Sequence, residues 1–318
     1  MNGRKCRVLE QTESEAEMET EQTLTRKQFD FLHALTKTKD GTLTKRQLEK
    51  ETGYSLGTVN KLGKELTALG YVENGRITAE GLEALEPYRA KRAIFIAAGF
   101  GTRLVPVTLN TPKPLVRVNG KRIIDGLIDA CLAVGIHEIY IVRGYLAEQF
   151  DQLLYKYPMI KFLENPSYNE ANNISSAVCA RYLMSNAYVF EADLLLRNPS
   201  IISKYHYASN YLGIPMERSN DWCFEVSGGV IKSLQIGGLN CYQEVGISYW
   251  DEASGKKLSN HLLQAYEMPG GKERYWDMVP LDIFAEDYEV EVRACSAEDI
   301  IEIDTFSELK AIDKSYDT

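Results

Sequence analysis

The stretch Ala93-Ile-Phe-Ile-Ala-Ala-Gly-Phe-Gly-Thr-Arg-Leu104, followed by Thr111-Pro-Lys-Pro-Leu115, decides the fold class of this chain. Its apolar first half, from Ala93 to Ala98, predicts a buried strand of a parallel sheet. The strand runs into two glycines, whose lack of a Cβ lets backbone N–H groups approach an anion closely. Arg103 and Lys113 follow as cations that suit phosphate oxygens. The stretch therefore predicts a loop that holds the phosphates of a nucleoside triphosphate.

Two commoner phosphate-binding loops do not fit this stretch. A P-loop needs G-x-x-x-x-G-K-[ST], which is missing here. A dinucleotide-binding loop needs G-x-G-x-x-G, but Leu104 stands at the position of the third glycine. The combination of G-x-G, an arginine two residues later and Pro-Lys-Pro downstream indicates a different class of nucleotide site.

Length and composition limit the remaining classes of protein. A chain of 318 residues suggests about two domains, and its net charge of −9 argues against a protein dominated by nucleic-acid binding. No apolar run approaches the ~20 residues that span a bilayer. The six cysteines lack C-x-x-C spacing and are typical of reduced, buried thiols. We therefore expect a cytoplasmic protein without a membrane segment.

The first part of the chain predicts a tail and a small helical domain. Residues 1–22 are acidic and offer little apolar surface, which indicates a disordered acidic tail. Residues 23–87 predict three helices, a β-hairpin at Asn74-Gly75 and a last helix, and this order resembles a small winged helix-turn-helix domain of bacterial transcription regulators. The third helix carries Lys61 and Lys64, few cations for a phosphate backbone. DNA contact and protein contact both remain open for this domain.

The second domain, residues 88–318, follows a predicted linker over Glu86–Arg92. Strand and helix patterns alternate from residue 94 to residue 191, as parallel βαβ units do, and the pattern becomes strand-rich after about residue 205. The predicted fold class is therefore α/β, a Rossmann-like domain with a mixed sheet, preceded by the winged-helix domain. Ligands are expected at the carboxyl ends of its parallel strands.

Two pairs of acids are candidates for a metal site. Glu191 and Asp193 follow an apolar strand, and Glu302 and Asp304 are two residues apart, so they lie on one face of a strand. Mg²⁺ prefers a few carboxylates together with phosphate oxygens and water. Asp193 and Asp304, assisted by Glu302, are therefore the predicted ligands of Mg²⁺ beside a triphosphate.

Each tryptophan of the chain stands beside an acid. Aromatic faces with nearby carboxylates suit a quaternary ammonium, which is held by cation–π and charge attraction. Buried tryptophans of a hydrophobic core are the alternative, and the sequence leaves both open. The pairs are Asp221-Trp222, Trp250-Asp251 and Trp276-Asp277, and Tyr249 and Tyr275 adjoin the last two.

Together these segments resemble the bacterial CTP:phosphocholine cytidylyltransferases over about residues 92–314. The glycine loop is common to nucleotidyltransferases, whereas the three tryptophan segments point to the phosphocholine branch. Glu191 stands where this branch often has Asp, and the simplest members lack the winged-helix extension. The matching segments are Ala97–Arg103 with Thr111–Pro114, Val142–Phe150, Asn172-Asn173 with Ser176, Glu191–Asp193, Asn220–Trp222, Gly246–Asp251, Tyr275–Asp277 and Ile301–Asp304.

The resemblance implies a Mg²⁺-dependent reaction of CTP with phosphocholine that gives CDP-choline and pyrophosphate. It implies Arg103 and Lys113 as the catalytic cations. The implied nucleotide-binding residues are Ala97, Ala98, Gly99, Gly101, Thr102, Tyr145, Asn172, Ser176 and Glu191. The implied acceptor-binding residues are Trp222, Tyr249, Trp250, Trp276 and Asp277, and the implied metal ligands are Asp193, Asp304 and Glu302.

Three other functions remain open at this point. The acceptor could be phosphoethanolamine or 2-aminoethylphosphonate, whose primary ammonium favours carboxylates over an aromatic cage. A sugar-1-phosphate nucleotidyltransferase would share the glycine loop but gives no reason for three Trp-acid pairs. A DNA-binding regulator with a transferase-like sensor domain is a different class, and the presence of Arg103, Lys113, Asp193 and Asp304 argues against it. A homodimer is an open expectation.

Overall fold

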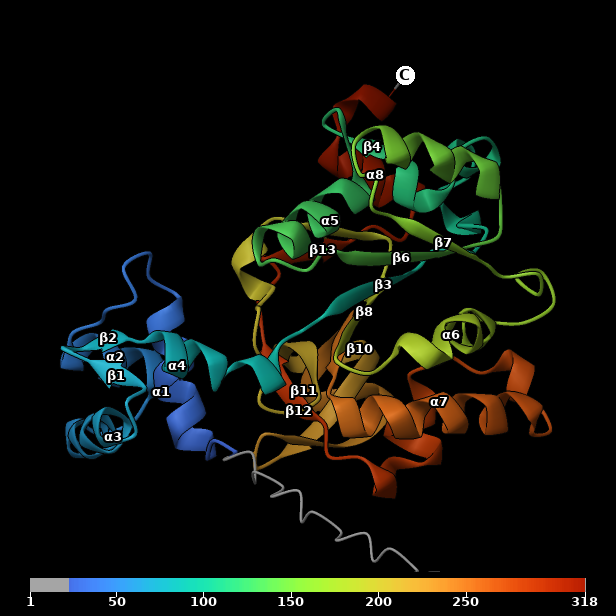
Figure 1. Ribbon diagram of the computed structural model, residues 1–318. Helices are drawn as coiled ribbons and strands as arrows, with labels where there is room; N and C mark the ends of the chain where they lie inside the picture. The colour runs from blue at the N-terminus through green and yellow to red at the C-terminus, as the bar shows by residue number, and fades with distance from the viewer. Residues whose placement is uncertain (1–22, 318) are drawn as a thin grey trace, which may run out of the picture. The chain divides into compact units, whose positions relative to one another are not determined.

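The computed structural model describes residues 23–317 (Figure 1), so the predicted acidic tail lies outside the described residues. The chain divides into two compact units, Met1–Ala84 and Leu85–Thr318. Among residues 23–317, no helix combines the length and the apolar character that crossing a bilayer requires.

The N-terminal unit has the predicted winged-helix order. Thr44, Ser55 and Thr78 cap their helices as expected, each accepting a hydrogen bond from a backbone N–H in the first turn. Asn74 and Gly75 both have positive φ, as a tight hairpin turn requires. The elements are α1 (Arg26–Thr36), α2 (Lys45–Thr52), α3 (Leu56–Ala68), β1 (Val72–Glu73), β2 (Arg76–Ile77) and α4 (Ala79–Glu83).

The second unit is built on a seven-stranded mixed sheet, which confirms the predicted fold class. β8, β3, β6 and β7 are parallel neighbours, and β11 joins them antiparallel to β8. In sheet order the strands are β10 (Asn210–Ser227), β12 (Glu291–Ala294), β11 (Val230–Trp250), β8 (Ala187–Glu191), β3 (Arg92–Ile96), β6 (Glu138–Arg143) and β7 (Lys161–Glu164).

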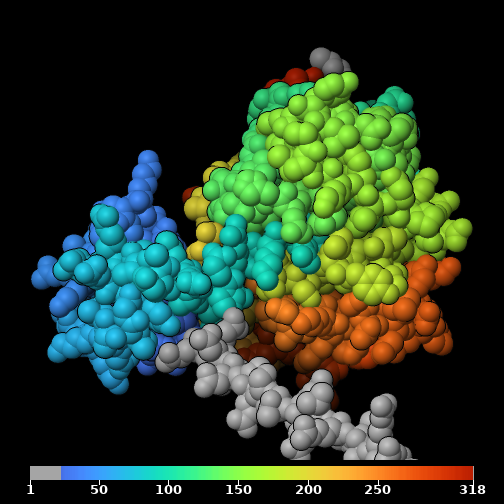
Figure 2. Space-filling model, in the orientation of Figure 1, coloured from blue at the N-terminus to red at the C-terminus, as the bar shows by residue number. Residues whose placement is uncertain are grey.

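Helices cover both faces of this sheet. α5 (Ile123–Ala133) lies on one face, and α6 (Ile174–Ala180) and α7 (Glu252–Glu267) lie on the other (Figure 1). Successive side chains of β3 therefore enter different cores: Phe95 packs with the α5 side and Ile94 with the α6–α7 side. α7 is buried on one side only, and its other side forms part of the surface (Figure 2).

The connections of β3 create the position for a ligand. The crossover that leaves β3 passes through α5 to β6, whereas the crossover that reaches β8 passes through α6 on the opposite face. β6 and β8 are the two neighbours of β3, so the chain direction across the sheet reverses at this strand. Ligands of open α/β sheets bind at such a switch point, outside the carboxyl ends of the strands.

A short C-terminal arm returns to this edge. β13 (Ile300–Glu302) pairs antiparallel with β9 (Leu194–Leu196), and α8 (Phe306–Ile312) packs beside the glycine loop in a small apolar cluster that includes Leu104 and Leu309. A separate hairpin of β4 (Arg117–Val118) and β5 (Lys121–Arg122) leads into α5.

The strand-rich pattern after about residue 205 forms the two long strands β10 and β11, which curl so that Cys223 pairs with both Gln235 and Gln243. One sequence expectation about local structure was wrong. The segment Glu86–Arg92 is no free linker. Ala90 is fully buried, its N–H donates to the carbonyl of Lys204, and Arg92 already belongs to β3. Its charged residues resemble a linker, but its backbone is hydrogen-bonded into the second unit.

Candidate active site

A pocket of about 450 Å³ lies at the carboxyl ends of β3 and β8, where the topology places a ligand. The glycine loop, the acids of the C-terminal arm and the curled β10–β11 hairpin all contribute to its wall. The residues that line it are Ile96, Ala97, Gly99, Gly101, Thr102, Arg103, Lys113, Pro114, Asn172, Asn173, Glu191, Ala192, Asp193, Asp221, Trp222, Glu244, Gly246, Tyr275, Asp277, Glu302 and Asp304.

The glycine loop has the geometry that its sequence predicts. Gly101 has φ +63°, and a Cβ on it would lie 3.0 Å from the Cβ of Lys113, so only glycine fits without strain. Thr102 begins a 3₁₀ turn directly after it. The hydroxyl of Thr108 donates to the Gly101 carbonyl at 2.8 Å, which fixes the loop against the segment that carries Lys113.

Lys113 and Arg103 meet the acids of the arm. The Lys113 ammonium lies 2.8 Å from Asp193 Oδ2 and 3.1 Å from Asp304 Oδ1, and Arg103 lies 2.7 Å from Asp304. Burial acts to lower the pKa of Lys113, but the neighbouring charges of Asp193 and Asp304 outweigh it and raise the pKa. Lys113 is therefore a permanent buried cation at the loop.

Glu191, Asp193 and Glu302 form the acidic centre of the pocket. Each offers one carboxylate oxygen, and these three oxygens all lie within 4.8 Å of one another. Burial, and then the charge of Asp193, raises the pKa of Glu191 well above its usual range, and the same causes raise the pKa of Glu302 to about 8. The buried Oδ1 of Asp193 accepts no hydrogen bond from the described residues. The other oxygen of this carboxylate, Oδ2, contacts Lys113, so Oδ1 is the position at which a further cation could bind.

Strand pairing explains how residues far apart in sequence form this centre. Asp193 lies directly before β9, and Glu302 pairs with Leu194 across the β13–β9 ladder. The N–H of Ile303 donates to the Asp193 carbonyl, which continues the contact toward Asp304. The arm therefore carries Glu302 and Asp304 back to the end of β8. β13 ends at Glu302, so Asp304 lies just beyond the strand on which the spacing had placed both acids.

The opposite end of the pocket combines aromatic rings with acids. Trp222 and Tyr275 meet edge to face, with ring centroids 5.8 Å apart. Asp277 and Glu244 hydrogen-bond to each other, and burial is the first cause that raises the pKa of both carboxyls. Two carboxyls in contact share a proton, so this wall offers both hydrogen-bond acceptors and negative charge to a ligand.

Two predicted acceptor residues lie elsewhere. Trp250 is fully buried between α7 and the sheet, where its indole N–H donates to Ser248 at 2.9 Å. Tyr249, one residue earlier, points to the other core and stacks on His206 with a centroid distance of 4.3 Å. The expectation that Tyr249 and Trp250 bind the acceptor was wrong, because successive residues of a strand enter the two cores of the sheet.

Trp276 is also a core residue. It is 1% exposed, packs edge to face on Trp250 and does not line the pocket, although its neighbour Asp277 does. Its backbone N–H donates to Asn173 Oδ1 at 2.9 Å, so it orients a pocket residue rather than providing a wall. The predicted three-tryptophan cage is therefore replaced by Trp222 and Tyr275.

The remaining predicted nucleotide residues lie at different depths. Asn172 lines the pocket, whereas Ser176 is buried and accepts a hydrogen bond from Asn165 at 3.0 Å. Tyr145 does not line the pocket; its hydroxyl donates to the carbonyl of Thr108 at 3.0 Å. Ala98 is buried behind the loop, and its carbonyl accepts from the N–H of Tyr145.

Sequence reasoning named Asn173 only as part of a matching segment, without a role, and missed Glu244. Asn173 donates to Glu191 at 3.3 Å and so links the acidic centre to the Trp276 segment. Gly246 faces the same carboxylate, since a Cβ there would lie 2.9 Å from Glu191 Oε2. Glu244 carried no local signal, because it lies within a long strand, between Gln243 and Val245, with no motif around it.

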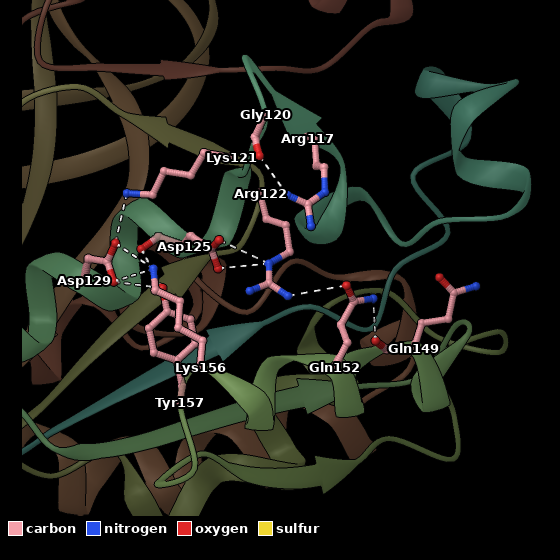
Figure 3. Close-up of polar contacts among 10 residues, drawn as sticks. All are labelled: Arg117, Gly120, Lys121, Arg122, Asp125, Asp129, Gln149, Gln152, Lys156 and Tyr157. Carbon is pink, nitrogen blue, oxygen red and sulfur yellow. Dashed lines mark hydrogen bonds and ion pairs between the residues drawn. The ribbon is translucent and has the colours of Figure 1, made fainter.

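A polar network holds the region beside the loop in place (Figure 3). Arg122 donates to both oxygens of Asp125 at 3.1 Å, and Asp129 accepts from Lys121, Lys156 and the Tyr157 hydroxyl. The contacts of Asp129 join β5 and α5 to Lys156 and Tyr157. Arg122 also donates to the side chain of Gln152 at 3.4 Å, which joins β5 to the 3₁₀ helix over residues 147–155. This helix in turn binds the loop segment, since the side chain of Gln149 donates to the Asn110 carbonyl at 2.7 Å.

A glycine loop after a parallel strand, a buried lysine beside it and clustered carboxylates, all at one switch point, are typical of a nucleotidyltransferase. Residues 92–209 match the nucleotidyl transferase family, and residues 22–76 match the MarR family of winged-helix proteins. The chain is 36% identical over 228 residues to a 2-aminoethylphosphonate cytidylyltransferase of Lancefieldella rimae, an alignment that covers 70% of this chain and 92% of the relative. The chain therefore belongs to the cytidylyltransferases of this family.

Two further comparisons agree. A choline-phosphate cytidylyltransferase of Streptococcus pneumoniae is 34% identical over 227 residues, which cover 70% of this chain and 97% of the relative. The solved structure of a CTP:phosphocholine cytidylyltransferase from Streptococcus pneumoniae matches with a TM-score of 0.65 and 30% identity, over 71% of this chain and 99% of that one. The match to the MarR family falls in the N-terminal unit.

Proposed function

We propose that this cytidylyltransferase transfers CMP from CTP to a small acceptor with a phosphate or phosphonate at one end and a primary ammonium at the other. 2-Aminoethylphosphonate and phosphoethanolamine have this chemistry. The observation that carries the proposal is the hydrogen-bonded Glu244–Asp277 pair in the pocket wall. A primary ammonium has three N–H donors that these carboxyls can accept, whereas a trimethylammonium has none.

The comparisons support a cationic acceptor in general. The relative from Lancefieldella rimae is named for an aminophosphonate and the relative from Streptococcus pneumoniae for choline phosphate, at nearly equal identity. A sugar 1-phosphate carries no cation, so the acids at this end of the pocket would face it without a partner.

Phosphocholine is the second candidate, as the sequence suggested. Trp222 and Tyr275 favour it, because two adjoining aromatic rings attract a quaternary ammonium. The burial of Tyr249 and Trp250 removes two expected walls of that cage and shifts the preference toward the primary ammonium.

The reaction requires positioning more than proton transfer. The phosphate or phosphonate oxygen of the acceptor attacks the α-phosphorus of CTP in line, and the bond from that phosphorus to the bridging oxygen breaks as pyrophosphate leaves. The nucleophile is already anionic, so no general base is needed. Lys113 and Arg103 would neutralise the phosphates, and the glycine loop, with Gly99, Gly101 and Thr102, would enclose them.

We further propose that Glu191, Asp193 and Glu302 hold Mg²⁺, with Asp304 as the remaining candidate ligand. The unpartnered buried oxygen of Asp193 and the all-oxygen donor set fit a hard cation that also binds phosphate oxygens. When bound, the ion supplies charge stabilisation to the reacting phosphates. Asp304 contacts both Lys113 and Arg103, so it also places the two cations near the loop.

A pyrophosphate-release assay tests the proposal. CTP, UTP, GTP and ATP are each combined with 2-aminoethylphosphonate, phosphoethanolamine, phosphocholine and glucose 1-phosphate, with and without MgCl₂. We expect turnover with CTP and the two primary-ammonium acceptors, and loss of turnover in EDTA. A higher kcat/KM for phosphocholine would contradict the proposed acceptor and leave the cytidylyltransferase intact. Turnover of glucose 1-phosphate alone would contradict a cationic acceptor altogether.

For the N-terminal unit, the match to the MarR family supports DNA contact. The few lysines of α3 give this contact only weak support. Lys61 of α3 lies 3.7 Å from Glu65, so part of its charge is already balanced. Titration of the full chain with labelled duplex DNA at several salt concentrations tests this contact, because binding through phosphates weakens steeply with salt. Protein contact is the alternative if no binding occurs at low salt.

A further inference from the structure

Two cysteine sulfurs border one small space in the curled β10–β11 hairpin, outside the catalytic groups described above. A Cβ on Gly238 would lie 3.0 Å from the sulfur of Cys223 and 3.2 Å from the sulfur of Cys241, so both thiols border the same small space. Two thiols that border one small space satisfy the first requirement for a disulfide.

The curl of the hairpin produces this contact. Cys223 lies opposite Gln243, and Cys241 stands two residues before Gln243 on the same strand. Residues at such diagonal positions share one face of the sheet and lie within side-chain reach. Gly237 has φ +76° and Gly238 follows it, which leaves the backbone around the pair free of bulky side chains. Small backbone adjustments are therefore available to bring the sulfurs into bonding distance.

We propose that Cys223 and Cys241 are an oxidation site that forms an intramolecular disulfide. A two-electron oxidant such as a peroxide oxidises one thiolate to a sulfenic acid. The second thiol then attacks that sulfur, the S–S bond forms, and water leaves. Over both steps two thiols and one peroxide give one disulfide and two waters. Reduction by a dithiol restores the pair.

The site reacts slowly under ordinary conditions. Both side chains are buried, and burial, followed by the contact with Cys241, raises the pKa of Cys223 to about 11. Little thiolate is present near neutral pH, and the thiolate is the reactive form. Oxidation should therefore accelerate as the pH rises and require sustained exposure to oxidant.

The disulfide would act on the acceptor end of the pocket. Trp222 directly precedes Cys223, and Glu244 follows Cys241 by three residues, and both line the pocket. The glycine loop follows β3 and shares no residue with this hairpin. This consequence rests on the proposed acceptor wall, whereas the disulfide itself does not. A covalent link should change the KM for the acceptor severalfold and leave the KM for CTP unchanged.

Peptide mapping of the full chain tests the disulfide directly. A Cys6→Ser background removes the thiol outside the described residues, and the protein is treated with diamide at pH 7 and at pH 9, quenched with an alkylating agent and digested. We expect a Cys223–Cys241 linked peptide, formed faster at pH 9 and lost after dithiothreitol. Alkylated Cys223 and Cys241 in all samples, while the half-exposed Cys179 reacts, would overturn the proposal.

Kinetics of the same samples test the consequence. Oxidised protein should recover its acceptor KM in dithiothreitol, and Cys241→Ala should be insensitive to diamide, whereas Cys131→Ala, altered at a buried thiol of the other core, should respond like the wild type. A linked peptide without any change in acceptor KM would confirm the disulfide and contradict its effect on the pocket. An equal response of Cys241→Ala would assign the effect to another residue and overturn the proposed site.

Discussion

The two ends of the pocket differ in the charges that line them. At the glycine-loop end cations meet acids, since Lys113 contacts Asp193 and Asp304. At the other end acids meet acids, since Glu244 hydrogen-bonds to Asp277, and no lysine or arginine lines this end among the described residues. At the glycine-loop end, an anionic group of a ligand can replace a carboxylate as the partner of Lys113. At the other end, the carboxyls of Glu244 and Asp277 can bind a cationic group. The difference predicts the orientation of the acceptor, with its phosphate or phosphonate toward Lys113 and its ammonium toward Asp277.

The largest effect should come from the glycine-loop end. Asp193→Ala and Lys113→Ala should each lower kcat by at least ~10²-fold, the scale seen when one preorganised electrostatic group is removed. Steady-state pyrophosphate release measures it. Lys121→Ala is the matched control, because it removes an exposed lysine that pairs with Asp129 at 2.9 Å away from the pocket. Wild-type rates in both pocket variants would mean that this end does not hold the reacting phosphates.

The next effect should separate the two ends by substrate. Asp277→Asn removes a negative charge from a buried wall, and losing a close charge partner there costs ~2 kcal/mol or more, so the acceptor KM should rise about 30-fold while the CTP KM stays the same. Asp251→Asn is a matched control. Asp251 also adjoins a tryptophan, but its carboxylate caps α7 by accepting from Ser254, a role that asparagine can fill. Equal increases in both KM values for Asp277→Asn would remove the distinction between the ends.

A smaller effect should separate wall tryptophan from core tryptophan. Trp222→Ala should raise the acceptor KM up to about tenfold, since a cation–π contact contributes ~0.5–2 kcal/mol, with little change in Tm. Trp250→Phe should lower Tm and leave the acceptor KM nearly unchanged, because it leaves a void in a core and a Ser248 hydroxyl without its partner. Kinetics and thermal unfolding of both variants check this contrast. A large acceptor effect in Trp250→Phe would return that residue to the site.

The smallest expected effect concerns stability and pH. The pKa of Glu302 is about 8 in the folded chain against 4.5 for an ordinary glutamate, so its protonated form is favoured by folding. This contribution is complete below pH 4.5 and is lost as the pH rises through 8. Thermal unfolding without divalent cations should show a falling Tm over this range, and Glu302→Gln should flatten the fall. An unchanged slope in Glu302→Gln would mean that the carboxyl titrates normally.

The loop end of the site could be predicted from sequence because its chemistry is local. Gly101, Arg103 and Lys113 lie within a short stretch whose glycine, arginine and lysine are constrained by phosphate geometry. Asp193 and Glu302 were also identifiable, because each stands at the end of an apolar strand. Their contact with each other depends on the β13–β9 pairing, which no short-range pattern specifies.

The acceptor end could not be predicted in the same way. The three Trp-acid pairs look alike in sequence but play different roles: Trp222 lines the pocket, Trp250 fills a core beside a helix cap, and Trp276 is buried while Asp277 is in the wall. Which neighbour faces the ligand depends on strand direction and on the curl of the hairpin. Glu244 was missed for the same reason, because its partner lies on a different segment.

The segment Glu86–Arg92 determines where the chain can be divided between its two units. The division of the chain falls after Ala84, yet the next few residues are anchored in the second unit, where Arg89 donates to the Gly135 carbonyl at 3.1 Å. A truncated or fused chain that begins among the charged residues 86–92 would lack part of the hydrogen-bonded segment that leads into β3. One that begins at Leu85 would keep this segment complete. We therefore expect the second unit to fold when it begins at Leu85, either alone or fused to a different N-terminal domain.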